Sequence, residues 1–418
     1  MRKLLLTSIL TLFFPPVLMA ASGPEALSFY QQEITSFPTQ NDRASRLYAA
    51  ALADGLETWA VQHEQQTSAQ DALFMQARLL LRAQENGRAL VTIFRLRRLF
   101  PGLDFNALLP LLNEASTSLH TQSRDEAANL FKTASVQESS TVPQREAQAL
   151  YELSKLTGHT FYPAAVRAFE NFFRQFPNYS GNNEVELWYG DLHRLNGNYL
   201  AAIFQYKKAD ELYPQSPYKA ASLRLIGDIY ADNLKDPGTA LQIYTQVLRQ
   251  FPNSSETGIV YKHMAILDEN RKQYDSALIN YDKAIELLGT DPAAYEAYRG
   301  KADVYIKTKN YEQAYDLLHK TAALFQADKE AASQAVLAAA KVAKNQLRSQ
   351  TKYAQSLEKA LLLHPAADQA PAWMYELGQT YEQTQPDKAK YTYKKLILKA
   401  PTGKYASKAQ RRLTRLEK

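Results

Sequence analysis

The sequence predicts an all-α protein in which helix hairpins stack into a solenoid, and three regularities support this prediction. Alanines recur at spacings of 37, 38, 37 and 37 residues. A large apolar residue follows each alanine by four positions, and a small residue precedes each of the last four by twelve or thirteen. Because a fixed period of about 20–50 residues is typical of repeat architectures, we expect a solenoid or array. The recurring alanines are Ala165, Ala202, Ala240, Ala277 and Ala314.

The spacing inside each unit indicates two helices. At about 3.6 residues per turn, one helix face carries Tyr274, Ala277, Tyr281 and Ala284. The small residue lies on a separate upstream helix, expected over 259–270, and a short polar turn joins the two. Each unit is therefore predicted to be a helix hairpin. One hairpin cannot bury its apolar face alone, so neighbouring hairpins must stack.

Further residues recur at fixed places within these hairpins. The upstream helix carries Ile226, Gly227 and Tyr230 in one unit and Leu377, Gly378 and Tyr381 in another. The downstream helix carries Ala202, Tyr206, Ala209 and Pro214. This pattern resembles the tetratricopeptide repeat, although the period is longer than the usual length of about 34 residues. The resemblance implies a right-handed α-solenoid of tetratricopeptide-like hairpins.

The joins between units resemble a periplasmic and outer-membrane-associated subset of this family. Three phrases carry that resemblance: Phe176-Pro177-Asn178, Tyr213-Pro214-Gln215-Ser216-Pro217-Tyr218 and Phe251-Pro252-Asn253-Ser254. The subset includes the lipoprotein of the outer-membrane β-barrel assembly machinery and the Tol-associated division coordinator.

Residues 1–21 are predicted to be a secretory signal peptide. Arg2 and Lys3 are basic, the run from Leu4 to Phe14 is apolar, and small residues follow at 20–22. A membrane anchor is the alternative, but eleven apolar residues are too few to span a bilayer. The chain has no cysteine, which excludes disulfides, thiol chemistry and a lipid-modified cysteine. We therefore expect export to the periplasm and no transmembrane segment in the mature chain.

Four segments are expected after the signal peptide. Residues 22–134 form an N-terminal helical region with a degenerate repeat at 69–101, and 113–134 is predicted to be helical. Residues 135–143 are predicted to be a loop or hinge, or a long connection between repeats, because they are polar. The core array is expected over 144–325. Repeats and a capping helix are expected over 326–418.

Two basic stretches have alternative interpretations. Arg95, Arg97 and Arg98 are expected to lie on a solvated helix face, with an acidic partner or anionic lipid surface as the alternative. The amphipathic stretch 402–418 is expected to cap the array. A basic helix lying on a membrane surface is the alternative, so peripheral membrane association stays open.

Composition and motifs argue against catalysis. The net charge of +6 falls to +4 without Arg2 and Lys3, which does not favour nucleic-acid binding in a chain of 418 residues. The seven histidines are scattered, without the paired spacing of a zinc helix. There is no glycine-rich phosphate loop and no Gly-x-Ser-x-Gly elbow. We therefore predict no enzyme activity, no metal and no cofactor.

The candidate binding site follows from the family resemblance, in which the upstream helix of each hairpin lines a concave groove. Its fifth, ninth and twelfth positions point into that groove. Three consecutive units place a cation at the fifth position, roughly 10 Å apart if the helices pack normally. Bridging pairs within one helix, Arg224–Asp228 and Arg299–Asp303, are the alternative. The candidate residues are Leu187, Asp191, Arg194, Arg224, Asp228, Lys262, Arg299 and Asp303.

The predicted function is a non-enzymatic scaffold that binds another protein in the cell envelope. A preorganised concave surface would hold an extended segment or a helix at little ordering cost to the scaffold. Two alternatives are an adaptor in polysaccharide or protein secretion or outer-membrane assembly, and an accessory subunit of a periplasmic enzyme.

Overall fold

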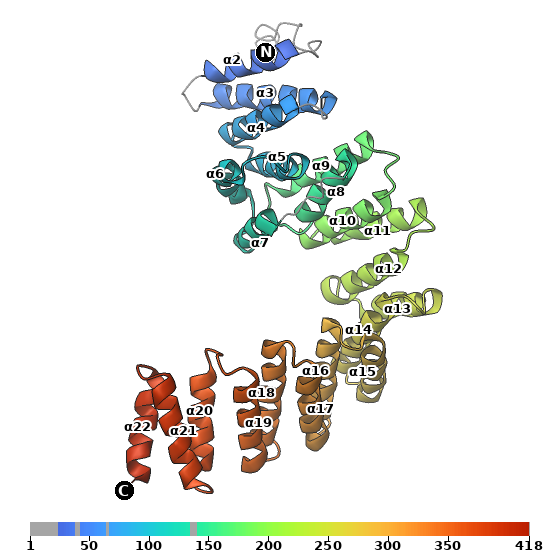
Figure 1. The fold of residues 1–418 in the computed structure, drawn as a ribbon. Helices are drawn as coiled ribbons and strands as arrows, with labels where there is room; N and C mark the ends of the chain where they lie inside the picture. Colours follow the sequence, from blue (N-terminus) through green and yellow to red (C-terminus); the bar gives the residue numbers. More distant parts are fainter. Residues whose placement is uncertain (1–23, 38–41, 64–66, 134–139, 418) are drawn as a thin grey trace. The chain divides into compact units, whose positions relative to one another are not determined.

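The computed structural model describes residues 24–37, 42–63, 67–133 and 140–417. Every regular element in these ranges is a helix, which confirms the predicted all-α class (Figure 1). The chain forms two compact units, unit 1 ending at Ser222 and unit 2 beginning at Leu223. This boundary falls inside the segment 144–325 that was expected to form one array.

Unit 1 contains ten α-helices before the boundary and one short 3-10 helix within the described ranges. They are α2 (Pro24–Thr35), α3 (Arg43–Gln62), α4 (Thr67–Arg82), α5 (Asn86–Leu99), α6 (Phe105–Ala115), η2 (Ser116–Ser118), α7 (Thr121–Thr133), α8 (Val142–Leu153), α9 (Tyr162–Gln175), α10 (Asn182–Leu195) and α11 (Tyr199–Leu212). Helix α12 (Lys219–Asp228) crosses the boundary.

Unit 2 continues from α12 through a π-helical turn and a run of helices. They are η3 (Ile229–Asn233), α13 (Pro237–Gln250), α14 (Glu256–Asn270), α15 (Tyr274–Leu288), α16 (Pro292–Lys307), α17 (Tyr311–Leu324), α18 (Lys329–Asn345), α19 (Gln350–Leu363), α20 (Ala370–Tyr381), α21 (Pro386–Lys399) and α22 (Lys404–Leu416). Helices adjacent in sequence pack against each other, including α14 with α15 and α18 with α19, as the predicted hairpins require.

The recurring small and aromatic residues meet where the two helices of a hairpin cross. Gly227 on α12 lies against the ring of Tyr244 on α13, and a Cβ atom there would stand 2.5 Å from the ring. Gly190 lies against Tyr206 in the same way, at 2.2 Å. A side chain at the glycine would occupy the space of the tyrosine ring, so the pair sets how closely the helices approach. The five recurring alanines are all fully buried.

The turn inside each hairpin repeats one backbone conformation. The residue two positions before the second helix has a positive φ, which is 79° at Gly197, 55° at Lys235, 61° at Lys272 and 63° at Lys309. At Gly197, Lys272 and Lys309 the next residue donates its backbone N–H to a carbonyl five residues earlier, as from Gln273 to Asp268 at 2.8 Å, whereas after Lys235 the span is six, from Asp236 to Tyr230. This is the hydrogen-bond pattern with which helices commonly end.

The single spacing of 38 residues has a structural cause. Between Gly227 and Ala240 there is one residue more than between Gly190 and Ala202. The π-helical turn η3 takes up that residue, and Leu234 donates its N–H to the carbonyl of Ile229 at 2.9 Å. An extra residue in a regular helix would rotate all later side chains by about 100°. The wider turn absorbs it and keeps the following side chains in register.

Two predicted boundaries are wrong. The predicted loop 135–143 ends earlier, because α8 begins at Val142 behind a capping box formed by Thr141 and Gln144; residues 135–139 lie outside the described residues. The predicted helix 113–134 is interrupted by η2 and an extended residue, Leu119. His120 there donates its N–H to the carbonyl of Thr157 at 2.9 Å. This long-range contact replaces a helical hydrogen bond.

The predicted solvated basic edge on α5 is also wrong. Arg95 forms a bidentate ion pair with Glu146 on α8, with N–O distances of 2.7–2.9 Å. Arg98 pairs with Glu152, and the side chains of both partners are less than 10% exposed. Burial raises the pKa of Glu152, although Arg98 acts to lower it. These arginines hold α5 against α8.

Candidate protein-binding surfaces

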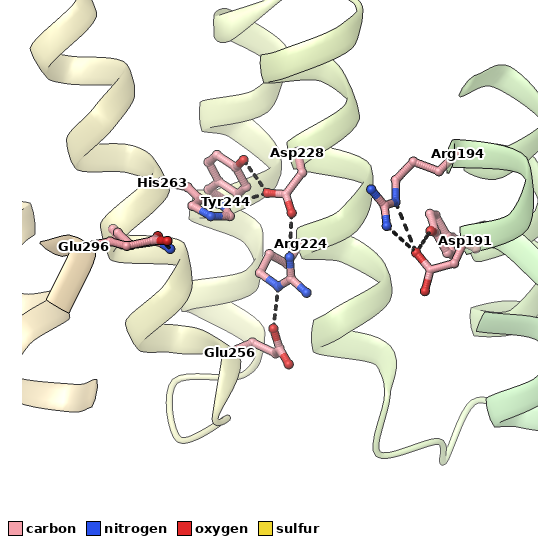
Figure 2. Close-up of polar contacts among 10 residues, drawn as sticks. Asp191, Arg194, Arg224, Asp228, Tyr244, Glu256, His263 and Glu296 are labelled. Atoms are coloured by element: carbon pink, nitrogen blue, oxygen red, sulfur yellow. Dashed lines mark hydrogen bonds and ion pairs between the residues drawn. The ribbon is translucent and has the colours of Figure 1, made fainter. Parts of the chain in front are cut away.

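Asp228 is the centre of the predicted site in unit 2 (Figure 2). Its Oδ1 atom accepts hydrogen bonds from the Tyr244 hydroxyl and from His263 Nδ1, each at 2.7 Å. Its Oδ2 atom pairs with Arg224 at 2.5 Å, and Arg224 also pairs with Glu256. Burial acts to raise the pKa of Asp228, but His263 and Arg224 together hold it below its usual value. The carboxylate therefore joins α12, α13 and α14.

In unit 1, Asp191 on α10 occupies the position equivalent to Asp228. It accepts a hydrogen bond from the Tyr206 hydroxyl at 2.9 Å and pairs with Arg194 at 2.8 Å (Figure 2). Leu187, one turn earlier, is half-buried. The second helix of the hairpin thus fixes the orientation of this aspartate through its tyrosine.

The cations at the fifth position have different surroundings. Lys262 pairs with Glu296 at 2.6 Å, and its side chain is 10% exposed. Arg224 is ion-paired on both sides, whereas Arg299 is exposed and lies over the ring of Tyr295 at 5.9 Å. Among the described residues no ion pair joins Arg299 to Asp303. The bridging alternative therefore holds for Arg224–Asp228 only.

These pairs reach from one hairpin to the next. Arg224 on α12 meets Glu256 on α14, and Lys262 on α14 meets Glu296 on α16. Carboxylates of the following repeat thereby offset two of the three predicted cations. Whether this row binds a partner stays a prediction.

Sequence reasoning missed a hollow in unit 1. This cavity, which we call the α3–α9 hollow, has a volume of about 690 Å³ and is lined by residues of α3, α4, α5, α8 and α9. Its apolar lining is Val61, Val91, Leu150, Phe172 and Phe176. The apolar surface could pack against a bound side chain without ordering the scaffold further.

The charges around the α3–α9 hollow are unevenly compensated. Arg88 pairs with Asp54 at 2.5 Å, and Arg95 pairs with Glu146. Arg167 and Arg174, on α9, are exposed and form no ion pair within the part of the chain that the structure describes. Among the described residues, Arg174 donates only to the amide oxygen of Asn171, at 3.2 Å. The rim therefore presents two arginines to any carboxylate that enters.

One sequence signal could have indicated this rim. On α9, positions at helical spacing on one face are Ala164, Arg167, Ala168, Asn171 and Arg174, which are small or polar rather than apolar. The helix face that carries two arginines is thus visible in the sequence. The hollow itself is not visible in the sequence, because helices far apart in the chain contribute to it.

The repeats are confirmed by comparison with known families. Models of the tetratricopeptide repeat match residues 158–217, and again 221–254 and 374–403. The chain contains tetratricopeptide repeats. The matched segments include α10 with α11, α12 with α13, and most of α20 with α21. Both units therefore carry tetratricopeptide hairpins, and such repeats imply protein partners.

A curated relative is the human protein O-mannosyl-transferase TMTC1, which is 27% identical over 232 residues. The match covers 55% of this chain but only 24% of that protein. Two similar solved structures are tetratricopeptide proteins. The C-terminal part of a repeat-containing protein from Cytophaga hutchinsonii is 16% identical and covers 63% of this chain and 98% of its own, with a TM-score of 0.45. PilW, a type IV pilus biogenesis factor, is 14% identical and covers 56% and 99%, with a TM-score of 0.41.

Two kinds of feature are absent from the described ranges. None of the helices there combines the length and apolar character needed to cross a membrane. No group of three or more potential metal ligands occurs among those same residues.

Proposed function

We propose that this protein is an exported, non-enzymatic scaffold of the cell envelope that binds a partner protein in the α3–α9 hollow. The observation that carries the proposal is an open cavity of about 690 Å³ with an apolar lining and two uncompensated arginines on its rim. Tetratricopeptide repeats imply protein partners, and the hollow lies in a unit that contains them.

The hollow indicates the chemistry of the partner. Arg167 and Arg174 can each form bidentate hydrogen bonds with a carboxylate. The apolar lining between α5 and α9 suits one or two large side chains. The expected occupant is therefore an amphipathic segment with acidic residues beside an apolar anchor.

Export to the periplasm is part of this proposal. It rests on the predicted signal peptide at 1–21, which lies outside the described residues, and on the joins that resemble periplasmic members of the family. If the proposal is right, protein recovered from envelope fractions begins at Ser22 in an N-terminal sequencing experiment. Recovery with Met1 intact from the cytoplasm would contradict it.

The secretion adaptor and the enzyme accessory subunit remain as alternatives within this proposal. The overlap with the O-mannosyl-transferase spans about a quarter of that protein, so it favours a shared repeat segment over a shared reaction. Turnover of a glycosyl donor by the purified chain without any partner would overturn the scaffold proposal.

Site-specific photo-crosslinking in intact cells tests the hollow. A photoreactive residue at Asn171, inside the hollow, is expected to yield a discrete adduct with one protein. The double variant Arg167→Glu, Arg174→Glu should reduce that adduct about tenfold or more, because two attractive contacts become repulsive. The matched double variant Arg249→Glu, Lys320→Glu, which changes exposed cations of α13 and α17, should leave it unchanged.

A further variant distinguishes the hollow from the predicted helix row, the cations Arg224, Lys262 and Arg299 at the fifth helix position. Arg299→Glu changes an exposed cation of that row. If the adduct at Asn171 survives the α9 double variant, the hollow is not the binding site. A photoreactive residue at Asp303 tests the helix row. If it forms an adduct that is lost in the Arg299→Glu variant, the helix row is the binding surface.

A further inference from the structure

The last two helices of unit 2, which pack together and are called the α21–α22 hairpin below, have a charge very different from that of the rest of the chain. Residues 386–418 contain eleven Lys and Arg against two Asp and Glu, a net charge of +9. Residues 1–385 contain 38 against 41, a net charge of −3. The overall charge of +6 therefore hides a concentrated positive end.

The apolar face of α22 is already occupied. Ala406, Ala409 and Leu413 are buried, and α22 packs against α20 and α21. This helix covers the end of the array, as the capping interpretation predicts. It cannot turn the same face to a membrane while it stays packed, so any lipid contact must use other side chains.

Helix α21 supplies such side chains. Tyr391, Lys394, Lys395 and Leu398 are spaced so that they share one helix face, and all four are exposed. The exposed fractions of Tyr391 and Leu398 are 66% and 84%. Both large side chains therefore keep most of their surface in water, with lysines between them, and bury little of it within this unit.

The cations of the hairpin are mostly without carboxylate partners. In the described chain, the ion pairs of α21 and α22 are Lys390–Asp387, Lys394–Glu417 and Arg412–Glu382. The remaining exposed cations form no ion pair there. On α22 they are Lys404, Lys408, Arg411 and Arg415, and all four lie on one helix face.

We propose that the α21–α22 hairpin docks on an anionic phospholipid surface, with Tyr391 and Leu398 entering the headgroup region and the surrounding cations contacting lipid phosphates. A combination of exposed apolar side chains and clustered Lys and Arg is typical of surfaces that bind the membrane interface. Nucleic acid would use the cations but gives an aliphatic side chain such as Leu398 no comparable contact. This proposal is independent of the α3–α9 hollow and adds an attachment point to the scaffold.

Vesicle co-sedimentation of the full chain tests the proposal. The probes are phosphatidylcholine vesicles with and without about 30% phosphatidylglycerol. We expect binding only to the anionic vesicles, with the bound fraction falling as salt rises. Each cation near such a surface contributes about fivefold to partitioning, so Lys394→Glu, Lys395→Glu should lower the partition coefficient by about 25-fold or more. Leu398→Ser should lower it severalfold at unchanged charge.

Matched controls use exposed residues elsewhere in unit 2. Lys320→Glu, Lys341→Glu makes the same charge change on α17 and α18, and Leu362→Ser removes a leucine that is 80% exposed. Neither should alter partitioning by more than about twofold. All variants share the same N-terminus, so any lipid contact of residues 1–21 cancels, and equal melting curves verify folding.

Three outcomes would overturn the proposal. The first is equal binding to neutral and anionic vesicles. The second is equal loss with the α21 variants and their controls. The third is that the chain binds duplex DNA or poly-glutamate as strongly as it binds anionic vesicles, and that Leu398→Ser changes none of these affinities. That result would assign the hairpin to polyanions in general.

Discussion

At the scale of single residues, one carboxylate of unit 2 joins three neighbouring helices. Asp228 accepts from Tyr244 and His263 and pairs with Arg224, so α12, α13 and α14 meet at its two oxygens. Its place at the ninth helix position was predicted as a groove residue. Its partners were only partly predictable, because His263 lies 35 residues away in the sequence. His263 reaches Asp228 only because the next hairpin packs against this one.

Asp228→Asn is expected to destabilise the protein by about 2 kcal/mol at pH 7, because it leaves the Arg224 guanidinium with a neutral acceptor. The folded-state pKa of Asp228 is depressed, so its stabilising contribution is present above the unfolded-state pKa and is lost as pH falls through the folded value. The difference between parent and variant in urea unfolding should therefore shrink below about pH 4. A difference that grows on acidification would contradict the assignment.

At the scale of the helix hairpin, the alternation of small and large residues sets the distance between helices. Gly227 with Tyr244 and Gly378 with Tyr393 show the same contact, while Ala302 and Leu318 take the equivalent places in another unit. The sequence indicated these pairs because they are local and periodic. The break between α6 and α7 was not predictable, because it depends on the contact between His120 and Thr157.

Gly227→Ala is expected to cost about 1–3 kcal/mol, because its Cβ would overlap the Tyr244 ring. Gly227→Phe should cost more. Gly102→Ala is the control, since no atom lies within 4 Å of its added Cβ. Adding Tyr244→Leu to Gly227→Ala imitates the pair Ala302 and Leu318, so the two changes together should cost less than the sum of each alone. Additive free energies from urea unfolding would count against this contact.

The hairpin turns offer a change in the stabilising direction. Lys309 has a φ of 63°, a conformation that costs a residue with a Cβ about 1 kcal/mol. Lys309→Gly should therefore raise the free energy of unfolding by about 0.5 kcal/mol after the entropic cost of glycine. Gly197→Ala, at a φ of 79°, should lower it by about 1 kcal/mol. Thermal melts of both variants check the opposite signs.

At the scale of the whole molecule, the sequence indicated the repeats better than the sites. The regular spacing of the recurring alanines predicts hairpins in both units, and the tetratricopeptide matches confirm them. The α3–α9 hollow was missed because five helices contribute to it, and the ion pairs of Arg95 and Arg98 with α8 span more than fifty residues. Periodicity reports what lies on one helix face, whereas these features depend on which faces meet.

The π-helical turn η3 has a consequence for how such chains can vary. A one-residue insertion is usually expected to survive only in a loop, where it disturbs no packing. Here a helix next to a hairpin turn accommodates the additional residue while Gly227 and Ala240 on either side both keep their buried contacts. A difference in repeat length can thus be accommodated by a local change in helical winding. A sequence alignment that places the gap in the neighbouring loop would misassign the residues between η3 and that loop.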